Sequence, residues 1–465
     1  MADITVHQAY RFALDPTPDQ ARRMAMFAGA SRFAYNRMLA EVKATLAARQ
    51  WERRLLGAAL TQAQGWSLAA LRRTWNANKD RWAPWWREVS KEAFNHGLEA
   101  LSLALKNWAD GKKSGRKVGF PKFKKRAGRA SFAYTTGAIH VCDDRRSVQL
   151  PRLGRIHVHE NTRKLHRRLT AGSARILRAT VARDAAGRWH VSFTAEVQRA
   201  PERGTHRRHQ TVGVDVGVRD LLVAAAPDGQ EVLRAPAPRS LNDAQKRLRR
   251  LQRKTARQQQ GANRRAKTLR QIGRTHARAG NVRRDALHKA TTHLAQAADT
   301  IVVEDLNVAG MGRRKIGLGA RGRGFNRAAA DAAMGEVRRQ LEYKAGWYGS
   351  NLVEADRWFP SSKACSGCGR RKPSLPLSER TYSCDTNDGG CGLTMDRDLN
   401  AAVNLARCGV PPPRSGREGV NDGRRADRET DPAQAGDAGG NDPSTPHQPL
   451  RPDQTGTATP QEVAA

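Results

Sequence analysis

The order of apolar and polar residues changes character along the first half of the chain. Residues 3–14 alternate as a strand does, and 16–20 (PTPDQ) have the composition of a helix start, with Asp19 in the first turn. From about 20 to 110 the apolar residues recur at helical spacing, and from 131 to 197 short alternating segments return, joined by turns. The pattern predicts a small antiparallel barrel or sandwich in which a helical block separates the first strand from the others.

Short apolar runs and long helical stretches alternate in the second half. Residues 211–225 predict a strand, a turn and a second strand, and 300–304 predict a buried strand. Between them, 243–295 predict a basic helical hairpin, and beyond them 327–346 predict a helix and 350–356 a strand. Strands that alternate with helices in this way are typical of an α/β domain.

The chain carries a formal charge of +39 and has a pI near 11.2. From Gly409 onward the last 57 residues are rich in Pro, Gly, Asp, Thr and Gln, which predicts disorder, and they hold six basic and nine acidic residues. The preceding body therefore carries about +42, a charge that would repel itself unless a polyanion neutralised it. A base composition that favours Arg codons would explain Arg in place of Lys, but not the shortage of acids. Nucleic acid is the expected partner.

Two segments concentrate this charge. Residues 111–126 (GKKSGRKVGFPKFKKR) predict a cationic loop interrupted by glycines, and 243–290 contain sixteen Lys or Arg against Asp243 and Asp285. Both are expected to face phosphates, and a solvated hairpin is the alternative for the second. Tryptophans between 51 and 108 are interpreted mainly as packing residues, with a minority that stack on bases. The expected nucleic-acid contacts from these segments are Lys122, Lys124, Arg249, Arg253, Arg264 and Arg283.

Two features concern the compartment. The start of the chain (MADITVHQAY) lacks the blocks of a signal peptide, and no stretch approaches the roughly 18 apolar residues of a membrane span. Six cysteines, four of them within 365–391, are not spread like a disulfide framework and indicate one metal site in a reducing compartment. We therefore expect a cytoplasmic protein without membrane contact.

The four clustered cysteines have the spacing of a metal site. They are Cys365, Cys368, Cys384 and Cys391. Fifteen residues separate the two pairs, which suits a zinc ribbon with four thiolates in a tetrahedron and no open position. Six residues, not two, separate the last pair, so an inserted loop is expected. The zinc ion would be structural, and four unligated thiols remain the alternative.

Three carboxylates stand where predicted elements end or begin. Asp215 and Glu304 each follow an apolar strand, and Asp398 opens a helical segment. A carboxylate at the end of a hydrophobic strand is costly to desolvate unless a cation compensates. Two strands and a helix that each contribute one acid have the layout of an RNase H-like fold, in which such acids hold two divalent ions, taken as Mg²⁺, roughly 3.5 to 4 Å apart. Each acid alone could be structural, and Asp305 and Asp396 are second choices.

Together these motifs resemble the TnpB proteins encoded by insertion sequences, the ancestors of type V CRISPR effectors. The resemblance extends to about residue 408 and includes, in order, YRFALDPTPDQ, GFPKFKKR, VGVDVGVRDLLV, IVVEDLNVAGM, FPSSKACSGCG and CGLTMDRDLNAAVNL. It implies a multidomain α+β and α/β fold: an antiparallel wedge β-barrel with an inserted helical recognition bundle, then an RNase H-like RuvC domain with an inserted zinc ribbon. The implied domains are a wedge at 1–19 and 111–205, a recognition bundle at 20–110, a RuvC domain at 206–357 and 393–408 with an arginine-rich hairpin at 243–295, a ribbon that binds target nucleic acid at 358–392, and a disordered tail at 409–465.

The resemblance also implies site residues. The family's catalytic acids fall on three positions of this chain, Asp215, Glu304 and Asp398. The resemblance alone favours the last of these over Asp396. Arg397 and Asn400 match flanking positions, with expected roles in phosphate contact or positioning, and 310–326 lie where such proteins carry a mobile lid.

The function implied is RNA-guided cleavage of DNA. Such proteins, encoded by transposable elements, bind a guide noncoding RNA, open double-stranded DNA beside a short adjacent motif and cut both strands in one RuvC site. We expect a monomer, or a dimer on one RNA, associated with the nucleoid of a prokaryote. The alternatives are an RNA-guided DNA-binding protein without cleavage, an accessory transposase, and a general basic RNA-binding protein.

Overall fold

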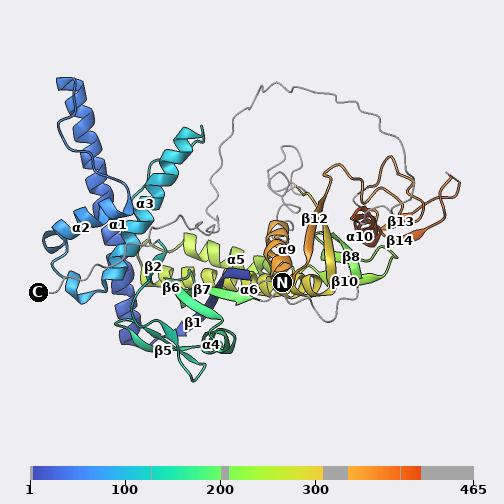
Figure 1. Ribbon diagram of the computed structural model, residues 1–465, viewed down its shortest axis with the longest axis horizontal. Coiled ribbons are helices and arrows are strands. Elements are labelled where there is room, and N and C mark those ends of the chain that lie inside the picture. Colours follow the sequence, from blue (N-terminus) through green and yellow to red (C-terminus); the bar gives the residue numbers. More distant parts are fainter. Residues whose placement is uncertain are drawn as a thin grey trace, which may run out of the picture. The chain divides into compact units, whose positions relative to one another are not determined.

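The computed structural model describes residues 4–126, 128–199, 209–306, 333–376, 378–387 and 389–409 (Figure 1). The expected lid, 310–326, and the expected tail beyond Gly409 lie outside the described residues. None of the helices in the described part combines the length and the apolar character that a membrane crossing requires.

An antiparallel sheet of seven strands organises the first half of the chain. Its order is β2-β6-β7-β1-β5-β4-β3. The strands are β1 (Ile4–Asp15), β2 (Ala130–Tyr134), β3 (His140–Val141), β4 (Ser147–Leu150), β5 (Gly154–Val158), β6 (Ala174–Arg183) and β7 (Trp189–Arg199), with helix α4 (Arg163–Thr170) between β5 and β6. The strand pairs seen within the described residues do not join β2 to β3, so closure into a barrel stays a prediction.

Three helices lie between β1 and β2 in the chain, as the pattern predicted. They are α1 (Pro18–Leu56), α2 (Leu68–Trp82) and α3 (Lys91–Lys113), with a short 3-10 turn at Trp86–Glu88. A capping box begins α1, because Thr17 accepts the Gln20 N–H and Gln20 accepts the Thr17 N–H. Phe27 of α1 packs edge-on against Phe132 of β2, with ring centroids 5.5 Å apart. Since α3 runs through Lys113, the expected cationic loop begins three residues later than predicted.

A second, mixed sheet of five strands organises the remainder. Its order is β10-β9-β8-β11-β12; β8, β11 and β12 are parallel, and β9 and β10 are antiparallel to their neighbours. The strands are β8 (His209–Asp215), β9 (Asp220–Ala225), β10 (Glu231–Pro236), β11 (Ala298–Glu304) and β12 (Asn351–Ala355). The helices are α5 (Ser240–Ala256), α6 (Asn263–Ala297), α9 (Met334–Tyr348) and α10 (Arg397–Cys408), and β13 (Thr381–Ser383) pairs with β14 (Thr394–Asp396) as a separate hairpin.

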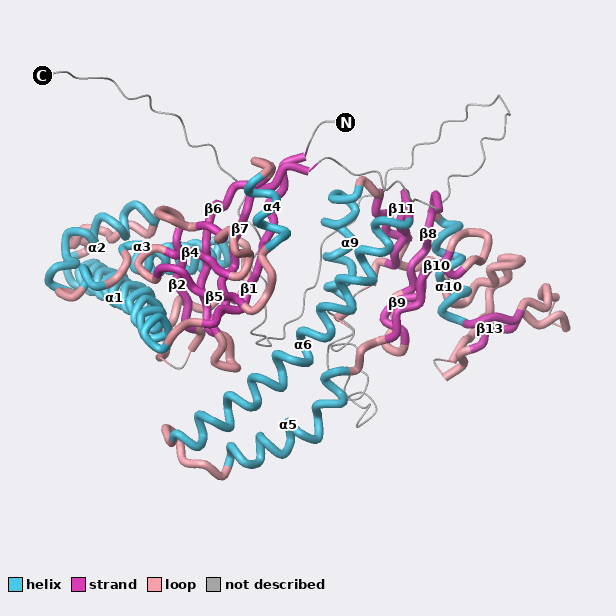
Figure 2. Tube along the Cα trace, turned by 90° about the horizontal axis from the view of Figure 1, so that it is seen from below, coloured by secondary structure: helices cyan, strands magenta, loops and turns pink. Residues whose placement is uncertain are grey.

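Helices cover both faces of this sheet. Figure 2 shows α6 and α9 on one side and α10 on the other. Val212 and Val214 belong to the core that includes Leu294 of α6 and Leu341 of α9. On the opposite face Gly213 has no side chain, and α10 approaches its backbone so closely that a Cβ there would lie 2.1 Å from the Ala402 carbonyl oxygen. Gly213 therefore permits the close approach of the helix that carries Asp398.

Replacing Gly213 by alanine is expected to destabilise the second sheet by about 3 kcal/mol or more, because the new methyl group meets backbone and not a flexible side chain. Gly29→Ala is the matched control: Gly29 lies within α1 and has open space around its Cβ position. Alanine there is expected to stabilise the helix by about 0.5–1 kcal/mol. Calorimetric melting of both variants checks this, and a Gly213→Ala protein that melts like the wild type would contradict it.

Candidate functional site

Three acidic side chains meet at one end of the five-stranded sheet. Asp215 is the last residue of β8 and Glu304 the last of β11, and the parallel register pairs Val214 with Val303, so the two acids end neighbouring strands. Asp398 lies in the first turn of α10, the helix that packs against β8. The structure thus brings together the three carboxylates that the sequence analysis selected.

The electrostatics of this cluster are unfavourable in the absence of a cation. Burial, followed by the charges of Glu304 and Asp398, raises the pKa of Asp215 well above its usual value. Burial and the charge of Asp396 raise the pKa of Asp398 in the same direction. Like charges this close oppose each other's ionisation, and a bound cation removes that penalty.

The spacing of the acids differs from that of a compact single-ion site. Within the described residues, the four cysteines are the one group of at least three His, Cys, Asp or Glu side chains whose ligand atoms all lie within 4.8 Å of one another. The three carboxylates are therefore more widely spaced.

Asp396 is already engaged in the structure. It is the N-cap of α10, and its Oδ1 accepts the backbone N–H groups of Asp398 (3.1 Å) and Leu399 (3.0 Å). The Arg234 guanidinium also lies 3.4 Å from the same oxygen. Its carboxylate therefore stabilises the helix start, which supplies a physical reason to prefer Asp398 as the metal ligand.

Asp305 is engaged in a similar way. Arg338 of α9 and Arg357, just beyond β12, form ion pairs with its two carboxylate oxygens at 3.3 and 2.5 Å. The neighbouring Glu304 accepts a hydrogen bond from the Ser361 hydroxyl and forms no ion pair within the described residues. Glu304 thus remains the more suitable ligand, and Ser361 orients it.

The four cysteines converge as expected. Cys365 Sγ lies 3.6 Å from Cys391 Sγ, and Cys368 Sγ lies 3.6 Å from Cys384 Sγ. These distances are far longer than the roughly 2.05 Å of a disulfide. They are close to the ~3.8 Å edge of a tetrahedron with Zn–S bonds of about 2.3 Å. Backbone N–H groups of Gly367 and Cys391 also donate to cysteine sulfurs, at 3.3 and 3.4 Å, so the site fits a zinc ribbon.

The wide spacing between Cys384 and Cys391 does not disturb this site. The inserted residues fold back on themselves, because the Gly390 N–H donates to the Asp385 carbonyl at 2.7 Å. Gly389 allows the turn with a φ of +75°. The loop thus leaves both cysteines in place.

Side chains of α10 fasten the cysteine turn to the sheet. Asn400 is fully buried; its Oδ1 accepts the Ser366 N–H at 2.9 Å and its Nδ2 donates to the Ala364 carbonyl at 2.7 Å. One helical turn later, Asn404 donates to the carbonyls of Ser361 and Ala364, both at 2.8 Å. Asn400 is thus engaged with the cysteine turn, which agrees with positioning, one of the two roles expected for it. Asn404, which the sequence analysis missed, shares that role at spacing i+4 on the same helix face.

Arg397 also contacts the ribbon. Its guanidinium donates to the Pro376 carbonyl at 2.9 Å and to the Glu379 carbonyl at 3.4 Å. Its charge lowers the pKa of Asp215 and of Asp398, which partly offsets the repulsion among the acids. Positioning, one of the two roles expected for this residue, agrees with these contacts.

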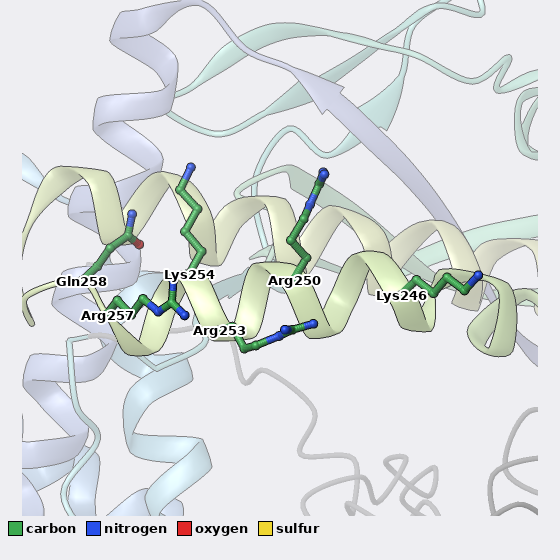
Figure 3. A pocket seen from close by; sticks show the side chains of 6 residues that line it. All are labelled: Lys246, Arg250, Arg253, Lys254, Arg257 and Gln258. Atoms are coloured by element: carbon green, nitrogen blue, oxygen red, sulfur yellow. The ribbon is translucent and has the colours of Figure 1, made fainter.

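A cationic pocket of about 600 Å³ runs along α5. It is lined by Lys246, Arg250, Arg253, Lys254, Arg257 and Gln258. Figure 3 shows these side chains extending from the helix, with Arg250 and Lys254 directed to the same side. Within the described residues, none of the five cations forms an ion pair. Leu248 and Leu251 are buried on the other face of the helix.

The remaining expected contacts lie outside the pocket, on α5 itself and on other parts of the chain. Lys122, Arg249 and Arg264 are exposed, and Arg283 is half-buried. Lys124 is held closely: its ammonium lies 4.1 Å from the centre of the Tyr35 ring, and its backbone exchanges two hydrogen bonds with Asn36. The sequence analysis named Arg253 but missed the other four cations of the α5 pocket, although their spacing of three and four residues marks one helix face.

The fold and the sites define a mixed α/β protein with a carboxylate cluster, a four-cysteine metal centre and a cationic pocket. Residues 192–315 match the family described as "Probable transposase" (OrfB_IS605), residues 335–405 match "Cas12f1-like, TNB domain", and residues 1–50 match "Helix-turn-helix domain". A protein of Mycobacterium tuberculosis H37Rv, named as a candidate RNA-guided DNA endonuclease, is 42% identical over 92% of each chain. The similarly named InsQ of Escherichia coli K12 is 30% identical over 86% of this chain and 92% of its own.

One solved structure, a Cas12f1-sgRNA-target DNA complex determined by cryo-EM, shares 12% identity with a TM-score of 0.47 over 86% of this chain and 99% of that chain. On the strength of the sequence relatives, the chain belongs to the TnpB family. The family predicted from the motifs is confirmed.

Proposed function

We propose that this protein is an RNA-guided DNA endonuclease of a transposable element, which cleaves DNA in one carboxylate site. The observation that carries the proposal is the convergence of Asp215, Glu304 and Asp398, three acids from distant parts of the chain, at one end of a mixed sheet. Counted within that sheet, the strand order is 3-2-1-4-5 with the second strand antiparallel. This arrangement supports the RNase H-like layout expected from the sequence.

The acids would hold two Mg²⁺ ions, which when bound activate water for attack on a phosphodiester and stabilise the leaving oxygen. The protein's own contribution is positioning. Ser361 orients the carboxylate of Glu304, and Asp396 caps the helix that presents Asp398. Asn400 and Asn404 hold the ribbon, with zinc as the proposed ion, against that same helix.

Guide RNA and target DNA are the proposed partners. The relatives' names support an RNA-guided reaction on DNA, and the cationic pocket on α5 suits a phosphate backbone. Within the proposal, the seven-stranded sheet is the wedge, α1 to α3 form the recognition bundle, and α5 and α6 are the arginine-rich hairpin. A chain that binds RNA and DNA but does not cut is the second candidate, since binding requires only the basic surface.

A single experiment separates the two candidates. The protein is purified without nuclease treatment, its bound RNA is sequenced, and the complex is incubated with Mg²⁺ and a plasmid library that carries the matching target beside random sequence. Linearised plasmids with one enriched flanking motif are expected. If the protein carries RNA and binds the target without cutting it, only the second candidate, binding without cleavage, remains. A purified protein free of RNA would contradict the proposal.

The α5 pocket is expected to supply much of the salt-dependent affinity for nucleic acid. Replacing Lys246, Arg250 and Lys254 by glutamine should lower the slope of log affinity against log salt by about 2–3, since each phosphate contact contributes roughly 0.7–0.9. The control is Arg22→Gln with Arg23→Gln, two exposed arginines already paired with Asp19. Filter binding at several salt concentrations checks this, and an unchanged slope in the α5 variant would contradict it.

A further inference from the structure

Trp358 is the most exposed large hydrophobic side chain in the part of the chain that the structure describes. It is 85% exposed, compared with 62% for Trp51 and 36% for Trp85. Tryptophan side chains usually bury most of their 150–250 Å². No packing role within the described residues therefore explains an indole at this position.

The turn that carries Trp358 is firmly anchored. The Trp358 N–H donates to Asp356 Oδ1 at 2.7 Å, and the Phe359 N–H donates to the Asp356 carbonyl at 3.0 Å. The Phe359 ring packs against the core residues Val302 and Leu405. The neighbouring ring is thus buried while the indole is held outward, so the exposure does not come from a loosely held loop.

This turn lies beside the carboxylate site. Ala355 is paired in register with Glu304, and Ser361 donates a hydrogen bond to that same carboxylate. Trp358 is three residues from each, so its Cα lies within about 11 Å of both by chain length alone. Arg357, the residue before it, is paired with Asp305. The indole is therefore within reach of a nucleotide whose phosphate lies at the acids.

The chemistry of the indole identifies the ligand. An exposed aromatic face in a strongly basic protein suits a nucleobase, and base stacking on an aromatic side chain is tolerant of sequence. A base inside a duplex is covered on both faces by its neighbours, so only an unpaired base offers a free face. A strand cut at the acids must therefore be unpaired beside the cut if its base is to stack there.

We propose that Trp358 is a positioning residue that stacks on an unpaired base of the DNA strand bound at Asp215, Glu304 and Asp398. This inference rests on the proposed function and adds to it the residue that positions the strand to be cut.

The first test measures cleavage by the full-length protein with its bound RNA, on target DNA whose cut strand is held unpaired. Trp358→Leu is expected to lower single-turnover cleavage at subsaturating DNA by about 5- to 150-fold, the range that stacking of one base contributes. Trp358→Phe is expected to restore most of the rate. Asp143→Ala, at an exposed acid between β3 and β4, is expected to cleave like the wild type. The proposal would be overturned if Trp358→Leu cleaved at the wild-type rate. It would also be overturned if Trp358→Phe cleaved as slowly as Trp358→Leu.

The second test does not depend on cleavage. A single-stranded oligonucleotide that contains 2-aminopurine is bound in magnesium-free buffer, and the fluorescence of that base is recorded. Quenching is expected with the wild type and with Asp143→Ala, and is expected to be lost with Trp358→Leu. Equal quenching in all three proteins would overturn the stacking role, and contact with a protein partner would then explain the exposed indole. A wild-type protein that carries no RNA or does not cut DNA would overturn the proposed function. That failure can be told apart from failure of the stacking proposal, because the fluorescence readout requires neither bound RNA nor cleavage.

Discussion

Asp215→Ala is expected to lower single-turnover DNA cleavage at least a thousandfold, about 4 kcal/mol in activation free energy. Asp215 ends the central strand of the sheet and lies in the field of both other acids. Its loss would remove one of the three carboxylates that would hold the two metal ions. RNA and DNA binding should stay within a few-fold of wild type, because phosphate contacts elsewhere carry affinity. Gel assays of cleavage and filter binding on the same preparations measure both.

Other acids of the chain supply matched controls. Asp143, an exposed acid between β3 and β4, should tolerate alanine without loss of cleavage. The cleavage rate of Asp398→Asn is expected to fall as far as that of Asp215→Ala. Asp396→Asn should stay within about tenfold of wild type, because asparagine caps a helix as well as aspartate does. Activity that depends on Asp396 and not on Asp398 would reverse the assignment of the third ligand.

Cys384→Ser is expected to abolish binding of the proposed zinc ion and to unfold the ribbon. Structural zinc sites contribute about 10–16 kcal/mol of apparent free energy, and serine replaces a thiolate with a poor ligand. Cleavage should fall as well, because Asn400 and Asn404 join the cysteine turn to the helix that carries Asp398. Metal analysis of the purified protein and limited proteolysis of residues 361–393 measure the effect.

Cys408→Ser is the control for this substitution. Cys408 is exposed at the end of α10 and lies outside the cysteine cluster. Its replacement should leave the metal content and the protease resistance unchanged. A Cys384→Ser protein that retains one zinc ion and resists protease would show that the other three thiolates suffice, and the proposed four-thiolate site would then be wrong.

Most elements were predictable from local patterns. The strand at 3–14, the helix start at Thr17 and the apolar runs before Asp215 and Glu304 all appear where the pattern placed them. β10 was missed because its short, half-exposed sequence, EVLRAP, has little alternation and ends in proline. This edge strand of the sheet could be found only from its pairing with β9, which is a tertiary observation.

The side chains around the site were less predictable than the site itself. Asn400 reads in sequence as a polar residue near a catalytic acid, and its full burial follows from the ribbon folding over α10. Trp358 reads as one more aromatic residue beside Phe359, yet one ring is packed and the other is 85% exposed. Both outcomes depend on which surface of the sheet a neighbouring segment covers.

The sequence by itself determined the charge of the protein, the cysteine spacing, the order of elements and the family, because each depends on residue type and local spacing. The tertiary structure decided which acids are available to ions. Asp305 and Asp396 also carry carboxylates, but they are engaged by Arg357 and Arg234, which lie 52 and 162 residues away in the chain. Only folding brings such partners together, and those pairings leave Glu304 and Asp398 as the acids available beside Asp215.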